Sequence, residues 1–143
     1  MIYWNNLDDK GRIMLPAGLR SEVKGNTLYI TQGVDKCLWL FSDEQWQKIA
    51  KEISSSTSIF QAKARIIMRR ILAPAQEIEI DRTGRINISP ALRQYAGLTK
   101  ECAVLGMNTY IEIWDKAVYD KYWEDNESAF QEASEDLGKM ISM

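Results

Sequence analysis

The sequence has 143 residues, 45% of them hydrophobic, which is enough for one compact domain or two small ones with a real core. It contains no histidine, the commonest metal ligand and general base near neutral pH, so Ser–His and Cys–His catalysis and most transition-metal sites are excluded. The formal net charge is −2, so a nucleic-acid partner would have to be attracted by local positive charge and not by the total.

The first part of the chain is predicted to form a β unit with one small helix. A polar turn over residues 8–11 leads into a short alternating strand, and a helix over residues 16–23 starts at a proline and stops at Gly25. Two further strands are predicted on either side of Gly33, which suits their turn because glycine readily takes positive φ. These strands span residues 28–31 and 37–41.

Two helices are predicted to follow this β unit. Ser42 and Gln45 have the spacing of a capping box at the start of the first helix. The serine-rich run at residues 54–58 is expected to break this helix and to act as a linker. The second helix is expected over residues 59–73, with Pro74 at its end.

The second part of the chain repeats this order. Strands, a short helix and two more strands are predicted at residues 77–80, 86–88, 90–95, 102–105 and 110–114. Gly97 is expected to stop the short helix, and Gly106 lies in the turn between the last two strands. Asp115 is the predicted N-cap of a final helix, and the remaining tail is acidic and partly helical.

The likeness between the two parts is an internal repeat. Residues 7–15 resemble residues 80–88 at an offset of 73 positions, and the same offset pairs Arg20 with Arg93. One register without gaps over about forty residues indicates a duplication.

The repeat predicts an α+β fold made of two tandem β units. The predicted parts are residues 1–53 (first repeat with its following helix), 54–75 (linker and connecting helix), 76–123 (second repeat with its following helix) and 124–143 (acidic tail). Four short strands alone bury too little apolar surface for a stable core, so we expect the two copies to pair with each other or with copies in another chain.

Each repeat carries an Asp-x-x-Gly-Arg turn, which spans residues 8–12 in the first and 81–85 in the second. The glycine allows a tight turn, and the arginine that follows can bond guanine O6 and N7 together or clamp a phosphate. Basic residues nearby can add phosphate contacts that fix the register on DNA. The predicted DNA-binding residues are Lys10, Arg12, Arg20, Arg82, Arg85 and Arg93.

Structural roles remain open for the same residues. Asp8 and Asp81 are expected to bond backbone amides within the turns, and the arginine of each turn can pair with this aspartate instead of with DNA. Arg20 and Arg93 can be solvated helix ends. The tryptophans are expected to pack in the core or at an interface. Three arginines of the connecting helix are expected to face solvent or an acidic neighbouring chain, namely Arg65, Arg69 and Arg70.

Several classes of function are not expected. No stretch is long and apolar enough to cross a bilayer, and residues 1–7 lack the basic start and apolar run of a secretory signal, so we expect a cytosolic protein with no membrane partner. Cys37 and Cys102 lie far apart in apolar runs and are expected to be buried core residues, with no disulfide or zinc site. Since no catalytic or phosphate-loop motif is present, we expect no enzyme activity, no cofactor and no small-molecule substrate.

Taken together, the two turns and their spacing resemble the MraZ family of bacterial regulators. The likeness runs from about residue 5 to residue 123 and is carried by residues 7–13, 16–20, 33–40, 81–86, 95–98 and 111–114. The chain departs from the pattern at Thr83, where the first repeat has Lys10, and at Ser89, where the first repeat has Pro16.

The resemblance implies two tandem AbrB-like swapped-hairpin units in a β-barrel-like body with an internal pseudo-twofold axis and flanking helices. It also implies a transcriptional regulator that binds short repeated boxes of double-stranded DNA upstream of the division and cell-wall gene cluster. A ring-shaped homo-oligomer and association with the nucleoid are implied as well. In an oligomer several turns act together, because linked sites raise the effective concentration for the next contact.

An antitoxin-like protein-interaction module is the alternative, since AbrB-like units also occur in toxin neutralisers. Such proteins generally have one β unit and a disordered tail that folds on the toxin. The duplication in this chain disfavours that alternative.

Overall fold

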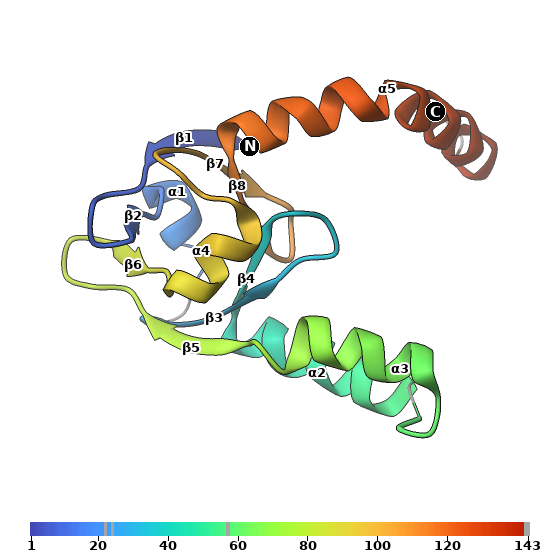
Figure 1. Cartoon of the computed structure of the whole chain (residues 1–143), viewed down its shortest axis with the longest axis horizontal. Helices are drawn as coiled ribbons and strands as arrows, with labels where there is room; N and C mark the ends of the chain where they lie inside the picture. The colour runs from blue at the N-terminus through green and yellow to red at the C-terminus, as the bar shows by residue number, and fades with distance from the viewer. Residues whose placement is uncertain (22, 24, 57, 142–143) are drawn as a thin grey trace.

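The computed structural model describes residues 1–21, 23, 25–56 and 58–141. It consists of a β-rich body from which helices project (Figure 1). The elements of the first half are β1 (Ile2–Asn6), β2 (Arg12–Met14), α1 (Ala17–Arg20), β3 (Thr27–Gln32), β4 (Leu38–Ser42), α2 (Asp43–Ser56), α3 (Ala62–Ile67) and the π-helix η1 (Met68–Leu72). Those of the second half are β5 (Gln76–Glu79), β6 (Arg85–Asn87), α4 (Pro90–Ala96), β7 (Glu101–Gly106), β8 (Ile111–Asp115) and α5 (Lys116–Met140).

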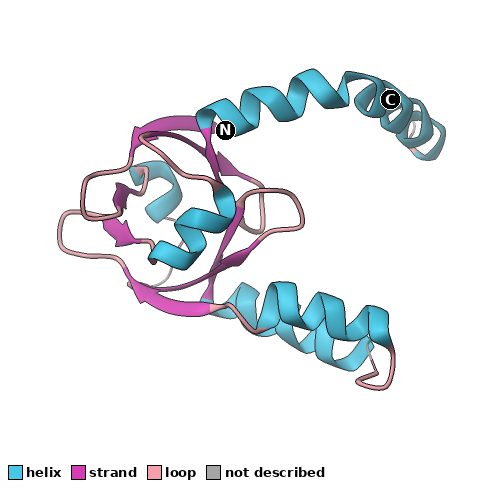
Figure 2. Cartoon of the chain, viewed as in Figure 1, coloured by secondary structure: helices cyan, strands magenta, loops and turns pink. Residues whose placement is uncertain are grey.

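The strands form a six-stranded sheet in the order β1-β7-β8-β4-β3-β5 and a two-stranded ribbon of β2 and β6. All of the strand pairs are antiparallel. β1 and β5 lie at the two ends of the larger sheet, so the described strands curve around a core without closing into a barrel (Figure 2). The fold is therefore α+β with two repeats, as expected.

Strands are exchanged between the two repeats. β1 of the first repeat pairs with β7 of the second, with Trp4 opposite Ala103. In the equivalent position, β5 of the second repeat pairs with β3 of the first. The ribbon also joins the repeats, because Ile13 in β2 lies opposite Ile86 in β6. The swapped-hairpin arrangement is thus formed within one chain, and neither repeat completes its sheet alone.

One apolar core serves both repeats. Equivalent positions from the two copies are buried together in it: Ile13 and Ile86, Leu15 and Ile88, Leu19 and Leu92, Leu38 and Ile111, and Leu40 and Ile113. Burying a large aliphatic side chain contributes about 1.5–3 kcal/mol, so this shared cluster is the main source of stability. Both cysteines are buried as expected, and burial raises the pKa of the Cys102 thiol to about 11.

The glycines between paired strands have a different role from the one predicted. Gly33 and Gly106 are not among the residues with positive φ, and the left-handed position in the second turn is taken by Asn108, with φ 74°. At Gly33 a Cβ would lie 2.8 Å from the Cys37 Sγ and 2.9 Å from the Trp39 Nε1. This glycine is needed for close approach of side chains and not for its backbone freedom.

Helix ends agree with the prediction in the second repeat better than in the first. Asp115 caps α5 by accepting from the amides of Ala117 (3.1 Å) and Val118 (3.3 Å), and Gly97 ends α4 with φ 63°. In the first repeat α1 ends at Arg20 with Ser21 as its C-cap, so Gly25 does not stop it.

The predicted serine linker was wrong in part. α2 continues through Ser56, and the Ser55 hydroxyl donates to the carbonyl of Glu52 at 3.3 Å, a local bond that lets a serine remain in a helix. The helix predicted from residue 59 starts at Ala62 and passes into the π-helix, where the amide of Ala73 donates to the carbonyl of Met68 at 2.9 Å. No helix among the described residues combines the length and the apolar character needed to cross a membrane.

Candidate nucleic-acid interface

The first Asp-x-x-Gly-Arg turn is held closed by one aspartate. Asp8 Oδ1 accepts from the backbone amides of Lys10 and Arg12, both at 2.9 Å. Asp8 Oδ2 accepts from the Arg12 Nε at 2.8 Å. Gly11 lies in the left-handed region with φ 81°, which the tight turn requires. The turn is therefore a rigid unit that fixes the direction of Arg12.

The second turn repeats this geometry. Asp81 Oδ1 accepts from the amides of Thr83 and Arg85 at 2.9 Å, and Oδ2 accepts from the Arg85 Nε at 2.9 Å. Thr83 adds a bond of its own, because its hydroxyl donates to Asp81 Oδ1 at 2.8 Å. Gly84 again has positive φ, at 86°. The sequence difference between the turns thus changes their charge and not their shape.

The hydrogen bonds stabilise both aspartates in the ionised form. The pKa of Asp8 lies below its ordinary value, chiefly because the amide of Arg12 donates to it. The pKa of Asp81 is lowered as well, chiefly by the amide of Arg85. The expectation that these aspartates bond backbone amides is confirmed.

Each turn arginine pairs with its aspartate, as the alternative interpretation predicted. The pairs use the Nε of Arg12 and of Arg85, and these side chains remain 29% and 32% exposed. A guanidinium carries further donors on both Nη atoms, and these lie at the end of the side chain. The ion pair therefore orients the arginine and leaves its Nη groups available to a ligand.

The ribbon brings the two turns to the same end of the molecule. Both loops lie at the left of Figure 1, opposite the side from which α2, α3 and α5 project. Strand alternation places Ile13 and Ile86 in the core, and the outward face of the ribbon carries Arg12, Met14, Arg85 and Asn87. Sequence reasoning missed Met14 and Asn87 at this face, although each lies two residues from a motif arginine in the alternating pattern.

The other four predicted residues divide into two pairs. Lys10 and Arg82 are exposed on the tips of the turns. Arg20 and Arg93 are half-buried at the base, so they are not freely solvated helix ends. Arg93 lies against Gly11 of the first repeat, and Arg20 lies against Gly84 of the second. The structure therefore brings all six residues to the region of the two turns.

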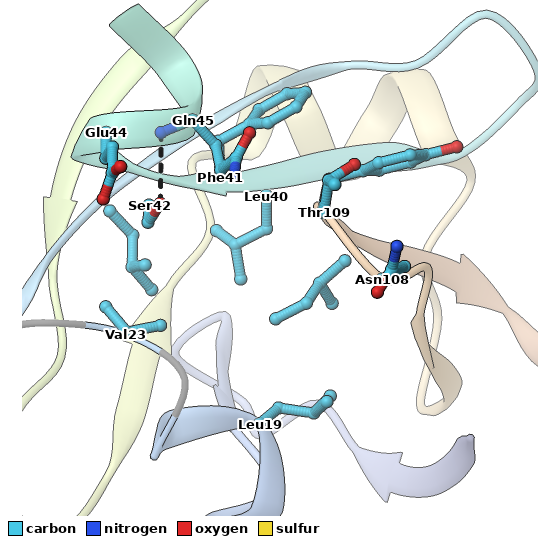
Figure 3. A pocket seen from close by; sticks show the side chains of 12 residues that line it. Leu19, Val23, Leu40, Phe41, Ser42, Glu44, Gln45, Asn108 and Thr109 are labelled. Carbon is cyan, nitrogen blue, oxygen red and sulfur yellow. Dashed lines mark hydrogen bonds between the residues drawn. The ribbon is translucent and has the colours of Figure 1, made fainter. Parts of the chain in front are cut away.

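A small cavity lies between α1 and β4. The cavity in Figure 3 has a volume of about 150 Å³ and a mixed lining of aliphatic side chains such as Leu19 and polar ones such as Ser42, whose hydroxyl accepts from the Gln45 backbone amide at 3.2 Å. Among the described residues, no group of three or more cysteines or carboxylates is placed to hold a metal ion.

The buried Glu112 accepts from the indoles of Trp39 (3.1 Å) and Trp114 (3.0 Å), which confirms a packing role for these tryptophans.

Comparisons with known proteins point to one family. A family model described as "MraZ protein, putative antitoxin-like" matches residues 3–70 and again residues 71–140. A Treponema denticola protein named transcriptional regulator MraZ is 49% identical over 138 residues, which cover 96% of this chain and 96% of that protein. Proteins of the same name from two strains of Treponema pallidum are 44% identical over 135 residues, or 94% of this chain and 91% of theirs.

Proposed function

The chain belongs to the MraZ family, and from that premise we propose that it is a sequence-specific DNA-binding transcriptional regulator that acts as a homo-oligomer. The observation that carries the proposal is the pair of Asp-x-x-Gly-Arg turns at one end of the body, each with an arginine oriented by an aspartate. Such a side chain is prepared to bind guanine or phosphate, because it loses little conformational freedom on contact.

The proposed interface consists of the six basic residues of the turns and their bases, Lys10, Arg12, Arg20, Arg82, Arg85 and Arg93. Arg12 and Arg85 are the proposed base-reading residues, since they stand on the outward face of the ribbon. Lys10 and Arg82 are the proposed phosphate contacts, because they are exposed at the tips. Each turn thus supplies one exposed cation, and the second turn has Arg82 where the first has Asp9, so we propose that both turns contribute to binding.

The distribution of charge supports DNA binding despite the net charge of −2. α5 contains seven acidic residues and three lysines, and it projects from the side of the body away from the turns (Figure 1). Charges separated by more than about 10 Å are largely screened at 0.1 M salt. The acidic helix therefore does little to repel DNA that approaches the turns.

The proposed targets are short repeated boxes of double-stranded DNA upstream of the division and cell-wall gene cluster, and the proposed location is the cytosol, on the nucleoid. Support for the targets comes from the family to which the chain belongs. Selection of bound sequences from a random DNA pool is the direct experiment. We expect enrichment of a short repeated box, whereas a pool that stays random would contradict sequence-specific binding.

Salt dependence gives a first quantitative prediction. Each phosphate contact contributes a slope of about −0.9 to a plot of log affinity against log salt concentration. We therefore expect the DNA affinity of the wild-type protein to fall steeply as salt is added. In Lys10→Ala, the slope should be shallower by about 0.9 for each protomer that loses its Lys10–phosphate contact. Lys51→Ala, which removes an exposed lysine from α2, is the matched control and should leave the slope unchanged. A flat salt response of the wild-type protein would exclude DNA as the partner.

Exposed apolar faces on the projecting helices support a homo-oligomer. Beyond the non-helical Asn126, α5 carries Phe130, Leu137 and Met140 at helical spacing, with exposures of 55%, 54% and 84%. On the other projection, Ile66 and Ile67 line a groove of about 430 Å³ together with Arg69 and Arg70. α3 and η1, all of whose residues the structure describes, contain four basic residues and no acidic one.

The opposite charges of these two faces suggest how copies meet. We propose that α5 of one protomer packs on the α3–η1 groove of the next, an arrangement in which different surfaces meet and a closed ring can form. Phe130→Glu should then shift the mass measured by light scattering from oligomer to monomer, because it places a carboxylate in an apolar contact. Ser128→Glu adds the same charge on the opposite side of the helix and should leave the mass unchanged. An unchanged mass for Phe130→Glu would show that α5 is not the contact.

An antitoxin-like interaction module is the second candidate, because the description of the matching family model includes that term. The helical order of α5 through Met140 weighs against it, since antitoxin tails typically order only on the partner. The random-pool selection separates the two functions, because an antitoxin-like module without a DNA role would enrich no sequence.

A further inference from the structure

The two turns are each supported by the opposite repeat. Gly11, in the first turn, is covered by the guanidinium of Arg93 from the second repeat. Gly84, in the second turn, is covered by the guanidinium of Arg20 from the first. The arrangement is reciprocal, as the pseudo-twofold relation of the repeats requires.

The contact is close enough to explain why both positions are glycine. A Cβ on Gly11 would lie 2.8 Å from the Arg93 Cζ, and a Cβ on Gly84 would lie 2.6 Å from the Arg20 Cζ. Both glycines are buried, although they belong to surface turns. Positive φ favours a glycine at both positions, and the nearby arginine adds a second, independent requirement.

Backbone hydrogen bonds hold the same glycines from the same side. The carbonyl of Gly11 accepts from the amide of Ile88 at 2.8 Å, and that of Gly84 accepts from the amide of Leu15 at 2.9 Å. In each case the donor and the covering arginine belong to the same repeat, and the glycine belongs to the other. Each turn is thus anchored by main chain and side chain of its opposite repeat.

The Nε end of the guanidinium group of Arg20 and Arg93 is buried in the protein interior but makes no hydrogen bond among the described residues. An unpaired buried donor is unfavourable, so these Nε atoms do not hold the side chains, and the contact of each guanidinium with its glycine is the interaction that the structure shows there. A lysine has no such plane, and it cannot reproduce the contact.

We propose that Arg93 is a positioning residue for Arg12 and that Arg20 is a positioning residue for Arg85. Gly11 and Gly84 immediately precede the turn arginines, so a shift of the glycine moves the base-reading side chain with it. The inference rests on the proposed function, and it assigns Arg20 and Arg93 a role in aligning the turn of the other repeat, in place of simple phosphate contacts.

The test is a double-mutant cycle on DNA affinity in the full chain. Arg93→Lys keeps the positive charge and removes the plane, and we expect it to weaken binding by about tenfold. Combined with Arg12→Ala it should cause no further loss, because the positioned residue is already gone. Combined with Arg85→Ala, its effect should multiply with that of the second substitution. Arg20→Lys should give the mirror pattern, coupled to Arg85 and independent of Arg12.

Hydrogen exchange gives a second measurement that needs no DNA. Arg93→Lys should speed exchange in the peptide containing the first turn, residues 8–12, and leave the peptide with residues 81–85 unchanged. Full affinity of Arg93→Lys, coupling within one repeat, or equal exchange in both turns would overturn the inference. Wild-type affinity of Arg12→Ala would instead overturn the proposed role of the first turn, and a random DNA pool without enrichment would overturn the proposed function, so the failures are distinguishable.

Discussion

Replacing Arg12 with alanine is expected to weaken specific DNA binding severely while the fold remains intact. A bidentate arginine–guanine contact contributes about 1–3 kcal/mol, so an oligomer that uses this turn in two protomers should lose about a hundredfold or more in affinity. The turn itself should persist, because Asp8 still accepts from the amides of residues 10 and 12, which alanine retains. A gel shift with the selected box, beside circular dichroism of the same preparation, measures both effects.

Two variants calibrate that experiment. Arg85→Ala should also weaken binding, because the second turn orients its arginine in the same way and carries Arg82 as its exposed cation. Lys51→Ala removes one positive charge from α2 on the far side of the body and should bind as the wild type does. Unchanged affinity of Arg12→Ala would exclude the first turn as the reader of DNA.

The largest loss of stability is expected from Ile86→Ala. This side chain is 0% exposed, and it lies opposite Ile13 in the ribbon that joins the two repeats. Emptying such a site typically costs about 2–5 kcal/mol in free energy of unfolding. Because one core serves both repeats, we expect a single unfolding transition shifted to lower urea concentration, with no separate melting of the second repeat.

Met14→Ala is the matched control for the core substitution. Met14 is in the same ribbon but on its outward face, with 40% of its surface exposed. Surface substitutions usually change the free energy of unfolding by no more than about 0.5 kcal/mol. Equal destabilisation by the two variants, or two resolved transitions for Ile86→Ala, would contradict a core shared between the repeats.

Much of the fold could be predicted because the signals were local and occurred twice. The alternating strands, the cap at Asp115 and the stop at Gly97 depend on residues that are near in sequence. The repeat also showed the order of elements in the β unit twice. The short helix α1 was predicted too long, because four residues give too little periodicity to mark an end. Residues 54–56 were misread as a break, since the local bond that keeps Ser55 helical is not visible in composition.

The candidate site was predictable in its residues and not in its contacts. The aspartate and arginine of each turn are four positions apart, so their pairing was one of the alternatives that the sequence allowed. The contacts of Arg20 with Gly84 and of Arg93 with Gly11 join residues far apart in the chain. They depend on the pairing of β2 with β6 across the repeats. The duplication led us to expect that the copies pair, but it does not indicate which side chains then meet.

Because strands are exchanged within one chain, this molecule resembles a two-subunit dimer whose halves are covalently joined. The identical subunits of a symmetric dimer have identical DNA-contacting surfaces, and the DNA sites that such dimers recognise tend to be palindromic. Once both halves lie in one polypeptide, each can change separately, as Lys10 against Thr83 and Asp9 against Arg82 illustrate. Under the proposed function, the two halves need not contact the same bases, so we expect the target box to be asymmetric.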